Sequence, residues 1–261
     1  MPTVQIDGHK VAYEEVGLGL PVLFLPGLIG STEWFKYQFS GLGTGYRIIS
    51  YELRQDTRKP EYTIDLLVED LAKFLAALRL HSVVLGGHSF GGMIAQQFAL
   101  TYPQSVSALV LVSSFPRLPK APQANIAELL APLNIPKEFP MRRLFGALTG
   151  RRAAAQDLEG AEWLAAHAPR ISRATINARV RLAASFDVTE HLGNIGIPAL
   201  VIAGGNEDPV LLDAAQGFYE NLPDATLEVI EGGDHFSFFT RHDLFNAAVD
   251  DFLSSRMTTL V

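Results

Sequence analysis

Short apolar runs alternate along the chain with stretches in which apolar residues recur every three or four positions. The run at 21–25 is continuously apolar, as expected for a strand buried on both faces of a sheet. After Thr63, apolar residues form one helical stripe, and Thr63 stands where an N-terminal cap belongs. Ser31 is expected to cap a shorter helix in the same way. The pattern predicts strands at 4–6, 10–15, 21–25, 46–51, 82–85, 108–112, 198–202 and 226–230, and helices at 31–39, 64–78, 90–101, 211–221 and 243–254.

The alternation of strands and helices is interrupted between residues 117 and 187. This segment is rich in proline, alanine and arginine, contains no strand pattern and is typical of short helices. On both sides of it strands alternate with helices, which predicts an α/β fold with a mostly parallel sheet and helices on both faces. We expect a core made of 1–116 and 188–261, with 117–187 inserted as a helical cap over the carboxyl ends of the strands.

Composition limits the class of protein further. The chain has 261 residues, 48% of them hydrophobic, enough for a substantial core without metals or disulfides. It contains no cysteine, which excludes a cysteine nucleophile and thiolate metal sites. Its first residues do not resemble a signal peptide, and no apolar run is long enough to span a membrane, so a soluble cytoplasmic protein is expected.

Charge is unevenly distributed. The net charge of −7 argues against a nucleic-acid partner. The segment 117–187 nevertheless holds 11 Lys and Arg against 6 Asp and Glu, so it is basic while the rest is acidic. Solvated helices resting on an acidic body explain this asymmetry, and a positive roof over a site for anionic or polar substrates is the alternative. We expect a small-molecule substrate, and neither a nucleic-acid nor a membrane partner.

The most informative motif is Gly87-His88-Ser89-Phe90-Gly91, which follows an apolar strand and opens a helix. A serine on a sharp strand-to-helix turn is a nucleophile elbow, and its glycines leave room where Cβ atoms would collide. The turn raises the hydroxyl above the sheet and directs the first helical amides toward it. Ser89 is therefore the expected nucleophile, although a glycine-rich turn with an incidental serine would give the same letters.

A serine nucleophile needs a base, and the base needs an acid to fix its tautomer. Of seven histidines, only His235 lies in a loop directly after a predicted strand, so it is the expected base. We interpret His88, inside the elbow, as a packing residue. After the strand at 198–202, Glu207 and Asp208 are adjacent carboxylates. Asp208 is the expected acid, and Glu207 is the alternative.

The oxyanion of an acyl-transfer intermediate needs preorganised donors. The backbone amide of Phe90, directly after the nucleophile, is one candidate, and the amide of Leu28 in the glycine-containing loop after strand 21–25 is the other. Candidate substrate-binding residues are large apolar side chains near these loops or in the cap segment. They are Ile29, Phe139, Phe145, Trp163 and Phe236.

These residues together resemble the α/β-hydrolase superfamily over about 10–255. The chain order Ser89, Asp208, His235 is similar to that family's order of nucleophile, acid and base. The resemblance implies an eight-stranded sheet, a helical cap inserted after the sixth strand, and chemistry without cofactors or metals. Two departures are visible: Pro26-Gly27 replaces the His-Gly common before the oxyanion residue, and 54–58 lacks the usual glycine-rich turn.

The resemblance implies a carboxylesterase-like serine hydrolase acting on a small or medium apolar ester. Amides, lactones and carbon–carbon bonds beside a ketone remain open, because the same triad attacks them. A lyase or cofactor-free oxidative enzyme is a second class, distinguished by products without oxygen from water. A ligand receptor that kept the fold without turnover is a third.

Overall fold

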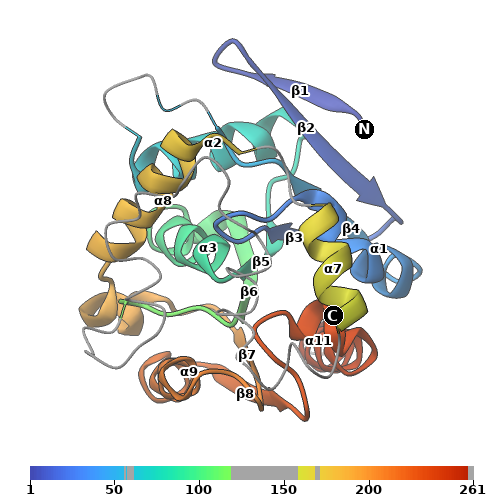
Figure 1. Cartoon of the computed structure of the whole chain (residues 1–261), viewed down its shortest axis with the longest axis vertical. Coiled ribbons are helices and arrows are strands. Elements are labelled where there is room, and N and C mark those ends of the chain that lie inside the picture. The colour runs from blue at the N-terminus through green and yellow to red at the C-terminus, as the bar shows by residue number, and fades with distance from the viewer. Residues whose placement is uncertain (56, 58–61, 119–157, 168–170, 258–261) are drawn as a thin grey trace.

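The computed structural model describes residues 1–55, 57, 62–118, 158–167 and 171–257. Eight strands form one sheet through the middle of the molecule (Figure 1), in the spatial order β1-β2-β4-β3-β5-β6-β7-β8. The strands are β1 (Thr3–Ile6), β2 (His9–Val16), β3 (Pro21–Leu25), β4 (Arg47–Tyr51), β5 (Val83–His88), β6 (Val106–Val112), β7 (Ala199–Gly204) and β8 (Ala225–Ile230).

Helices connect most of these strands. The described α-helices are α1 (Lys36–Leu42), α2 (Ile64–Ala77), α3 (Phe90–Thr101), α7 (Leu158–Ala166), α8 (Arg173–Ser185), α9 (Pro209–Asn221), α10 (Ser237–Thr240) and α11 (His242–Met257). Short 3₁₀ turns are η1 (Thr32–Phe35), η2 (Pro103–Ser105) and η3 (Thr189–Asn194).

The sheet is parallel from β4 to β8, and β2 joins it antiparallel to β4 and to the edge strand β1. The expected α/β fold with a mostly parallel eight-stranded sheet is confirmed. Because β3, β5, β6, β7 and β8 all run in one direction, their carboxyl ends share one edge, where open parallel sheets place their sites. The loops that contain Leu28, Ser89, Glu207 and His235 all follow this edge.

Alternate residues of each central strand enter different cores. In β5, Val83 and Leu85 pack toward α2, α3 and α9, whereas Val84 packs toward α1 and α11. This alternation follows from the two-residue period of a strand. Figure 1 shows these helix groups on opposite sides of the sheet. Burial on both faces explains why the strands are continuously apolar.

The two predicted helix caps have different outcomes. The Thr63 side chain accepts a hydrogen bond from Leu66 N at 3.1 Å, so the predicted cap of α2 is confirmed. Ser31 does occupy the N-cap position, of η1, but its side chain makes no cap bond, so only the position is as predicted. The Ser31 hydroxyl instead donates to the carbonyl of His167, just after α7, at 3.1 Å. The Glu52 carboxylate takes the place of a capping side chain and accepts from Thr32 N at 2.9 Å.

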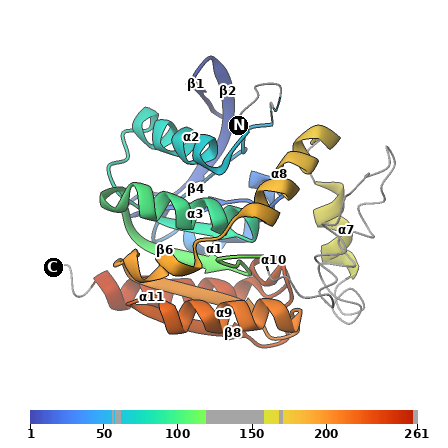
Figure 2. The ribbon, with the colours of Figure 1, turned by 90° about the vertical axis from the view of Figure 1, so that its left-hand side faces the viewer.

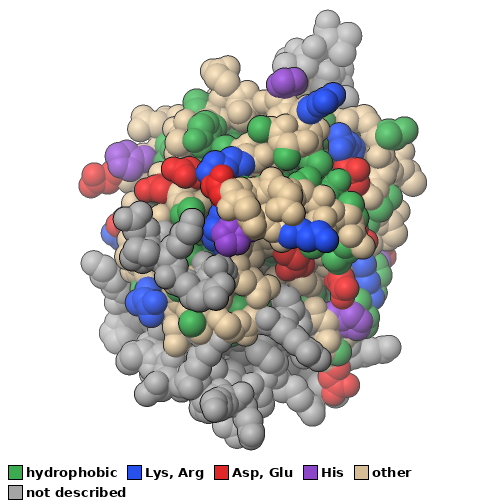
Figure 3. Space-filling view, turned by 90° about the horizontal axis from the view of Figure 1, so that it is seen from above, with side chains coloured by type: hydrophobic (Ala, Val, Ile, Leu, Met, Phe, Trp, Pro, Cys, Tyr) green, Lys and Arg blue, Asp and Glu red, His purple; other side chains and the backbone are tan. Residues whose placement is uncertain are grey.

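The described part of the predicted cap segment consists mainly of α7 and α8. Figure 2 shows α7 at the end of the molecule where α10 lies, and α8 beside α3. Arg117 and Asp187 stand at the two ends of the segment and pair in an isolated antiparallel bridge. The chain therefore leaves and re-enters the body at one place. On the face seen in Figure 3, basic and acidic side chains are interspersed among the described residues.

Candidate active site

Three neighbouring loops at the carboxyl edge of the sheet contribute the predicted catalytic residues. Ser89 directly follows β5, the carboxylates 207 and 208 follow β7, and His235 lies in the loop after β8. The His88 and His235 rings lie 4.7 Å apart between centroids, so the loops after β5 and β8 are in contact. The structure thus brings the nucleophile and base loops to one place.

Ser89 has the backbone conformation of a nucleophile elbow. Its φ of 52° and ψ of −114° are rare for a residue with a side chain. Hydrogen bonds to the next strand hold this conformation: Ser89 N donates to Val112 O at 2.8 Å, and the Ser114 hydroxyl donates to Ser89 O at 2.9 Å. The conformation is therefore maintained by bonds of the Ser89 main chain, one to a carbonyl and one from a neighbouring hydroxyl.

The glycines around Ser89 are required by close main-chain packing. A Cβ on Gly91 would overlap the carbonyl oxygen of Leu25 in β3, and a Cβ on Gly87 would overlap Gly91 itself. Backbone cannot move aside as a flexible side chain can. The spacing of the motif is thus explained by sterics, as the sequence predicted.

His235 is bonded to Glu207. The His235 ring is almost fully buried, and its Nδ1 lies 2.7 Å from Glu207 Oε1. With a carboxylate as acceptor, Nδ1 carries the proton, which leaves the lone pair of the neutral ring on Nε2. This is the tautomer that a general base needs.

The second oxygen of Glu207 is held as well. Oε2 accepts the Ser113 hydroxyl at 3.0 Å and the amide of Gly204 at 3.1 Å. Together with His235, three donors surround one buried carboxylate and fix its orientation. Ser113 has a φ of 47°, an uncommon value for a serine, and this main-chain turn immediately follows β6.

The choice of Asp208 as acid is therefore corrected: its near neighbour Glu207 is the residue at the imidazole. Asp208 is the N-cap of α9, and its Oδ1 accepts from Val210 N at 3.0 Å. The physical reason is local. Pro209 starts the helix, so the aspartate side chain turns back to a free helical amide, as N-cap aspartates do. The residue before the cap points to the site.

A third carboxylate, Asp234, is adjacent to the base but does not contact its ring through a hydrogen bond. Its Oδ1 accepts from Phe236 N at 2.8 Å and from the Thr240 hydroxyl at 3.1 Å. Burial raises the pKa of Asp234. These contacts bind the His235 loop to the start of α10, which is a structural role.

His88 is hydrogen-bonded to the main chain of His235, the expected base. The His88 ring is buried, and its Nε2 lies 2.8 Å from the carbonyl oxygen of His235. Burial, with a smaller contribution from the nearby His235, holds the pKa of His88 well below its ordinary value. The ring is therefore neutral, with Nε2–H donating to that carbonyl. The packing role inferred for His88 thus includes a hydrogen bond that the motif alone did not predict.

The predicted oxyanion residues lie on either side of the elbow. Phe90 is the first residue of α3 and is buried. Leu28 lies in a turn after β3 that is closed by Gly30 N donating to Gly27 O at 3.1 Å. The Leu28 carbonyl accepts from Arg179 Nη1 at 2.6 Å. These contacts place both loops at the carboxyl edge, and the use of their amides for an oxyanion stays a prediction.

The predicted substrate-binding residues have different surroundings. Phe139 and Phe145 lie outside the described residues. Trp163 on α7 is partly buried, and its ring stacks on His167 and Phe239 with centroids 3.8 and 5.1 Å away. Ile29 and Phe236 are buried in the apolar cluster beneath the loops. Contact of Trp163, Ile29 or Phe236 with substrate remains a prediction.

Two contacts were missed in the sequence. Ser113 gives no sign of its role, because a serine after a strand is common. Arg179 looks like one of several arginines on a polar helix, but its side chain is almost fully buried. The only signal for Arg179 in the sequence was its spacing of four residues from Thr175, which places both side chains on one face of a helix. The structure shows that Thr175 is buried as well.

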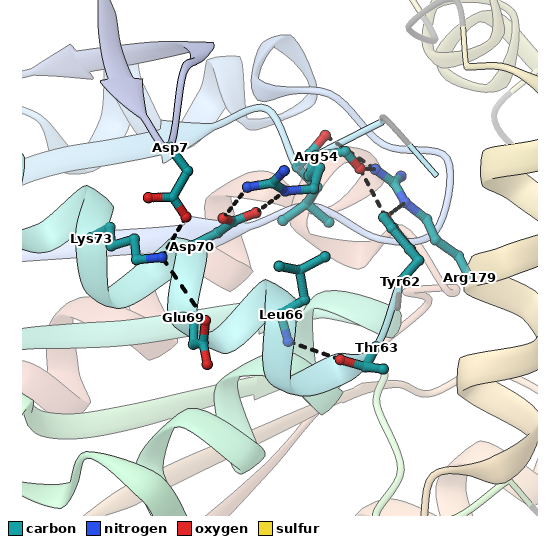
Figure 4. A network of polar contacts seen from close by, with 10 residues as sticks. Asp7, Arg54, Tyr62, Thr63, Leu66, Glu69, Asp70, Lys73 and Arg179 are labelled. Atoms are coloured by element: carbon teal, nitrogen blue, oxygen red, sulfur yellow. Dashed lines mark hydrogen bonds and ion pairs between the residues drawn. The ribbon is translucent and has the colours of Figure 1, made fainter. Parts of the chain in front are cut away.

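Nearby, the departure at 54–58 has a structural explanation at its first residue. The Arg54 guanidinium forms two hydrogen bonds of 2.6 Å with the buried carboxylate of Asp70 on α2 (Figure 4). Such a two-point contact fixes the orientation of both groups. The loop after β4 is thereby anchored without the usual glycine-rich turn.

Within the described residues, no three His, Asp or Glu side chains gather as metal ligands would. The same residues include no helix with the length and apolar character needed to cross a membrane.

Comparisons with known proteins agree with this geometry. The model of the alpha/beta hydrolase family matches residues 22–248. A putative carbamate hydrolase, RutD, of Variovorax paradoxus (strain S110) is 30% identical over 258 residues, which cover 90% of this chain and 92% of the relative.

Two solved structures extend the comparison. Est816, described as an N-acyl homoserine lactone degrading enzyme, has a TM-score of 0.81 and 26% identity, covering 96% of this chain and 100% of Est816. A thermophilic esterase from Thermogutta terrifontis has a TM-score of 0.83 at 24% identity, covering 97% of this chain and 96% of its own, and it shows the fold alone. With its fold, its elbow and a family match over most of its length, the chain belongs to the alpha/beta hydrolase family.

Proposed function

We propose that this chain is a serine hydrolase that cleaves a carboxylic ester of a small or medium apolar substrate. Ser89 is the nucleophile, His235 the base and Glu207 the acid. The observation that carries the proposal is the 2.7 Å contact between His235 Nδ1 and Glu207 Oε1, at the same sheet edge as a serine in elbow conformation. A buried acid that orients an imidazole is the arrangement that activates a serine hydroxyl on a neighbouring loop.

In the first half-reaction, Ser89 Oγ attacks the ester carbonyl carbon while His235 Nε2 takes the hydroxyl proton. The negative charge on the former carbonyl oxygen is stabilised by the amides of Leu28 and Phe90. The tetrahedral intermediate then breaks its bond to the alcohol oxygen, which leaves with the proton from Nε2. The acyl group remains bound to Ser89.

In the second half-reaction, water replaces the alcohol. His235 takes a proton from the water as its oxygen attacks the acyl carbon, and the returning proton restores the Ser89 hydroxyl as the acid leaves. Throughout, Glu207 holds the ring in one tautomer and stabilises its positive form without accepting the proton. No cofactor or metal takes part in this proposal.

Labelling tests the nucleophile. A fluorophosphonate probe followed by mass spectrometry is expected to modify Ser89, and Ser89→Ala is expected to lower kcat by about 10⁴-fold or more while keeping the fold. Ser40→Ala, at an exposed serine of α1, serves as the control and is expected to keep full labelling. An adduct on another serine, or near-normal turnover of Ser89→Ala, would refute the proposal.

A second candidate is hydrolysis of a carbamate or amide bond, favoured by the 30% identity to a putative carbamate hydrolase. Matched pairs of p-nitrophenyl esters and p-nitroanilides, in a series of acyl chain lengths, distinguish the two. Ester cleavage that exceeds amide cleavage at every chain length supports the first proposal. Reactions in H₂¹⁸O should place one labelled oxygen in the acid product, and unlabelled product would indicate a lyase or oxidative reaction.

A further inference from the structure

Arg179 is a buried cation whose hydrogen-bond acceptors among the described residues are all uncharged, although the partly buried Glu52 carboxylate also interacts with it electrostatically. It lies on α8, in the segment between β6 and β7, and only 1% of it is exposed. The four acceptors of its guanidinium among the described residues are the Tyr62 hydroxyl and three main-chain carbonyls. Removing a cation from water is expensive unless its donors are used, and Arg179 makes three of its four contacts with main-chain carbonyls, one of them in the loop that contains Leu28.

The partners of Arg179 lie in two loops of the body. Nη1 donates to Leu28 O at 2.6 Å, the shortest of the four contacts. Nη2 donates to Leu53 O at 3.3 Å and to Arg54 O at 3.2 Å, and Nε donates to the Tyr62 hydroxyl at 3.1 Å. Figure 4 shows the Arg179 side chain reaching from α8 toward Tyr62 and the main chain near Arg54.

Leu28 is the residue whose amide is the proposed oxyanion donor. Its amide and its carbonyl flank the same Cα, so a fixed carbonyl restricts rotation of the main chain next to the amide. The turn itself is closed by a single hydrogen bond, from Gly30 N to Gly27 O. A charged donor on Leu28 O adds a second fixed point to this turn, at the peptide that follows the proposed oxyanion amide.

Docking of α8 does not depend on Arg179 alone. Thr175 lies one turn earlier on α8, is fully buried, and donates from its hydroxyl to Gln55 O at 2.6 Å. Thr175 holds the helix on the loop after β4 without touching Leu28. Thr175 therefore only docks the helix, whereas Arg179 docks it and also contacts the oxyanion loop. Substitution of each residue in turn distinguishes the two roles.

We propose that Arg179 is a positioning residue that holds the Leu28 main chain in the conformation needed for its amide to stabilise the oxyanion. This proposal rests on the serine hydrolase function proposed above. Arg179 touches neither substrate nor the reacting atoms. It makes the donor preorganised, which is the property that gives an oxyanion hole its effect.

The test compares Arg179→Met with Thr175→Val as the matched docking control and Arg181→Met as an exposed arginine two residues later on α8. The readouts are the rate of fluorophosphonate labelling at Ser89, kcat and KM for a p-nitrophenyl ester, and the Tm. Because removal of an oxyanion donor costs about 10²–10³-fold in kcat, its misplacement should cost about 10–10²-fold.

For Arg179→Met, labelling and kcat are expected to fall together by that factor, while KM changes by less than about threefold, because the donor acts mainly on the transition state. Thr175→Val is expected to lower the Tm comparably but to keep labelling within about threefold. Arg181→Met should change neither. If Arg179→Met and Thr175→Val lose labelling equally, or if neither loses it, the proposal is overturned.

Arg179→Lys keeps the test usable if the methionine variant does not fold. A lysine cannot reach the Leu28 carbonyl and the carbonyls at 53 and 54 together, so about a tenfold loss of labelling is expected, and a wild-type rate would overturn the proposal. If the wild-type protein is not labelled at Ser89 at all, the serine hydrolase function fails instead, and the two failures are distinguishable.

Discussion

The loop after β5 and the loop after β7 both begin at the carboxyl edge of the sheet, but they fix their functional residues in different ways. In the first, main-chain collisions determine the shape, since Gly91 packs directly against the carbonyl of Leu25. In the second, the main chain presents two adjacent carboxylates, and competition for hydrogen-bond donors decides which one faces His235. A motif reveals the first kind of constraint, whereas the second depends on partners elsewhere in the chain.

This competition is resolved by what each carboxylate finds. Asp208 finds an amide of its own helix one residue beyond Pro209. Glu207, one residue earlier and one methylene longer, finds three donors, from the loop after β6, from β7 and from the loop after β8. Two adjacent residues with the same functional group, a carboxylate, therefore have unrelated roles.

The largest expected effect comes from exchanging the two carboxylates for amides. Glu207→Gln should lower kcat by about 10³–10⁴-fold, because an amide next to Nδ1 favours the wrong imidazole tautomer. Asp208→Asn should keep kcat within about threefold, since asparagine caps a helix as well as aspartate does. Steady-state kinetics on one ester substrate measures both.

Asp208→Ala completes this comparison. Loss of the cap should lower the free energy of unfolding by about 1 kcal/mol, measured by urea denaturation, with little change in kcat. If the kinetic effects at the two positions were reversed, Asp208 would be the acid, and the geometry of the loop after β7 would differ from the one described.

The next effect tests the steric constraint of the elbow. Gly91→Ala should destabilise the fold by about 1–3 kcal/mol and lower kcat by about 10²-fold, because α3 must shift away from Leu25 and carry the elbow with it. Gly217→Ala on α9 is the control, since nothing lies within 4 Å of its added methyl. That substitution should stabilise the helix by about 0.5–1 kcal/mol. Equal effects of the two substitutions would contradict a steric origin for the motif.

A smaller effect is expected from Ser113→Ala. The Ser113 hydroxyl is one of two donors to Glu207 Oε2, so its loss should lower kcat by about tenfold through a looser carboxylate. The matched control is Ser107→Ala in β6, the strand that precedes Ser113, because its buried hydroxyl has no hydrogen-bond partner among the described residues. A Ser113→Ala enzyme with unchanged kcat would show that Gly204 N and His235 suffice to orient the acid.

The last prediction is a pH dependence of the free energy of unfolding that is caused by His88. The pKa of His88 is lowered in the folded state. Below about pH 6.5, the ordinary pKa of a histidine, the ring therefore binds a proton more readily in the unfolded chain than in the folded one. Stability from the neutral ring is therefore complete above pH 6.5 and decreases as the pH falls, by up to about 1.4 kcal/mol per pH unit.

Urea denaturation between pH 8 and pH 5 measures this dependence. His88→Gln, which keeps a donor for the His235 carbonyl, should have a flatter profile than the wild type. Raised pKa values, such as that of Asp234, act in the opposite direction but are present in both proteins, so the difference isolates His88. Parallel profiles would mean that His88 is not buried in its neutral form.

The sequence predicted the features that depend on local chemistry. Apolar runs gave the strands because both faces of the sheet are covered, and Thr63 was found because an N-cap acts within its own turn. The elbow was found because the close packing of its main chain, even against the distant Leu25, requires glycines that stand within the motif itself. The Ser31 side chain was misread because its acceptor, the His167 carbonyl, lies 136 positions away. Arg179 was missed for the same reason, since its acceptors lie more than 100 positions away. Asp208 was preferred to Glu207 although the N-cap role of an aspartate before Pro209 is itself a local pattern.

The main-chain acceptors that bind the side chains of α8 have a consequence for chimaeras between members of the family. Thr175 and Arg179 donate to the carbonyls of residues 28, 53, 54 and 55, and every amino acid supplies a carbonyl whatever its side chain. The side chains at 28, 53 and 55 are thus free to diverge without loss of these acceptors, whereas Arg54 and Tyr62 also contribute through their side chains. A helix carrying this threonine and arginine should accordingly be transplantable onto another member of the family with the same main-chain path, where it would find its acceptors already in place.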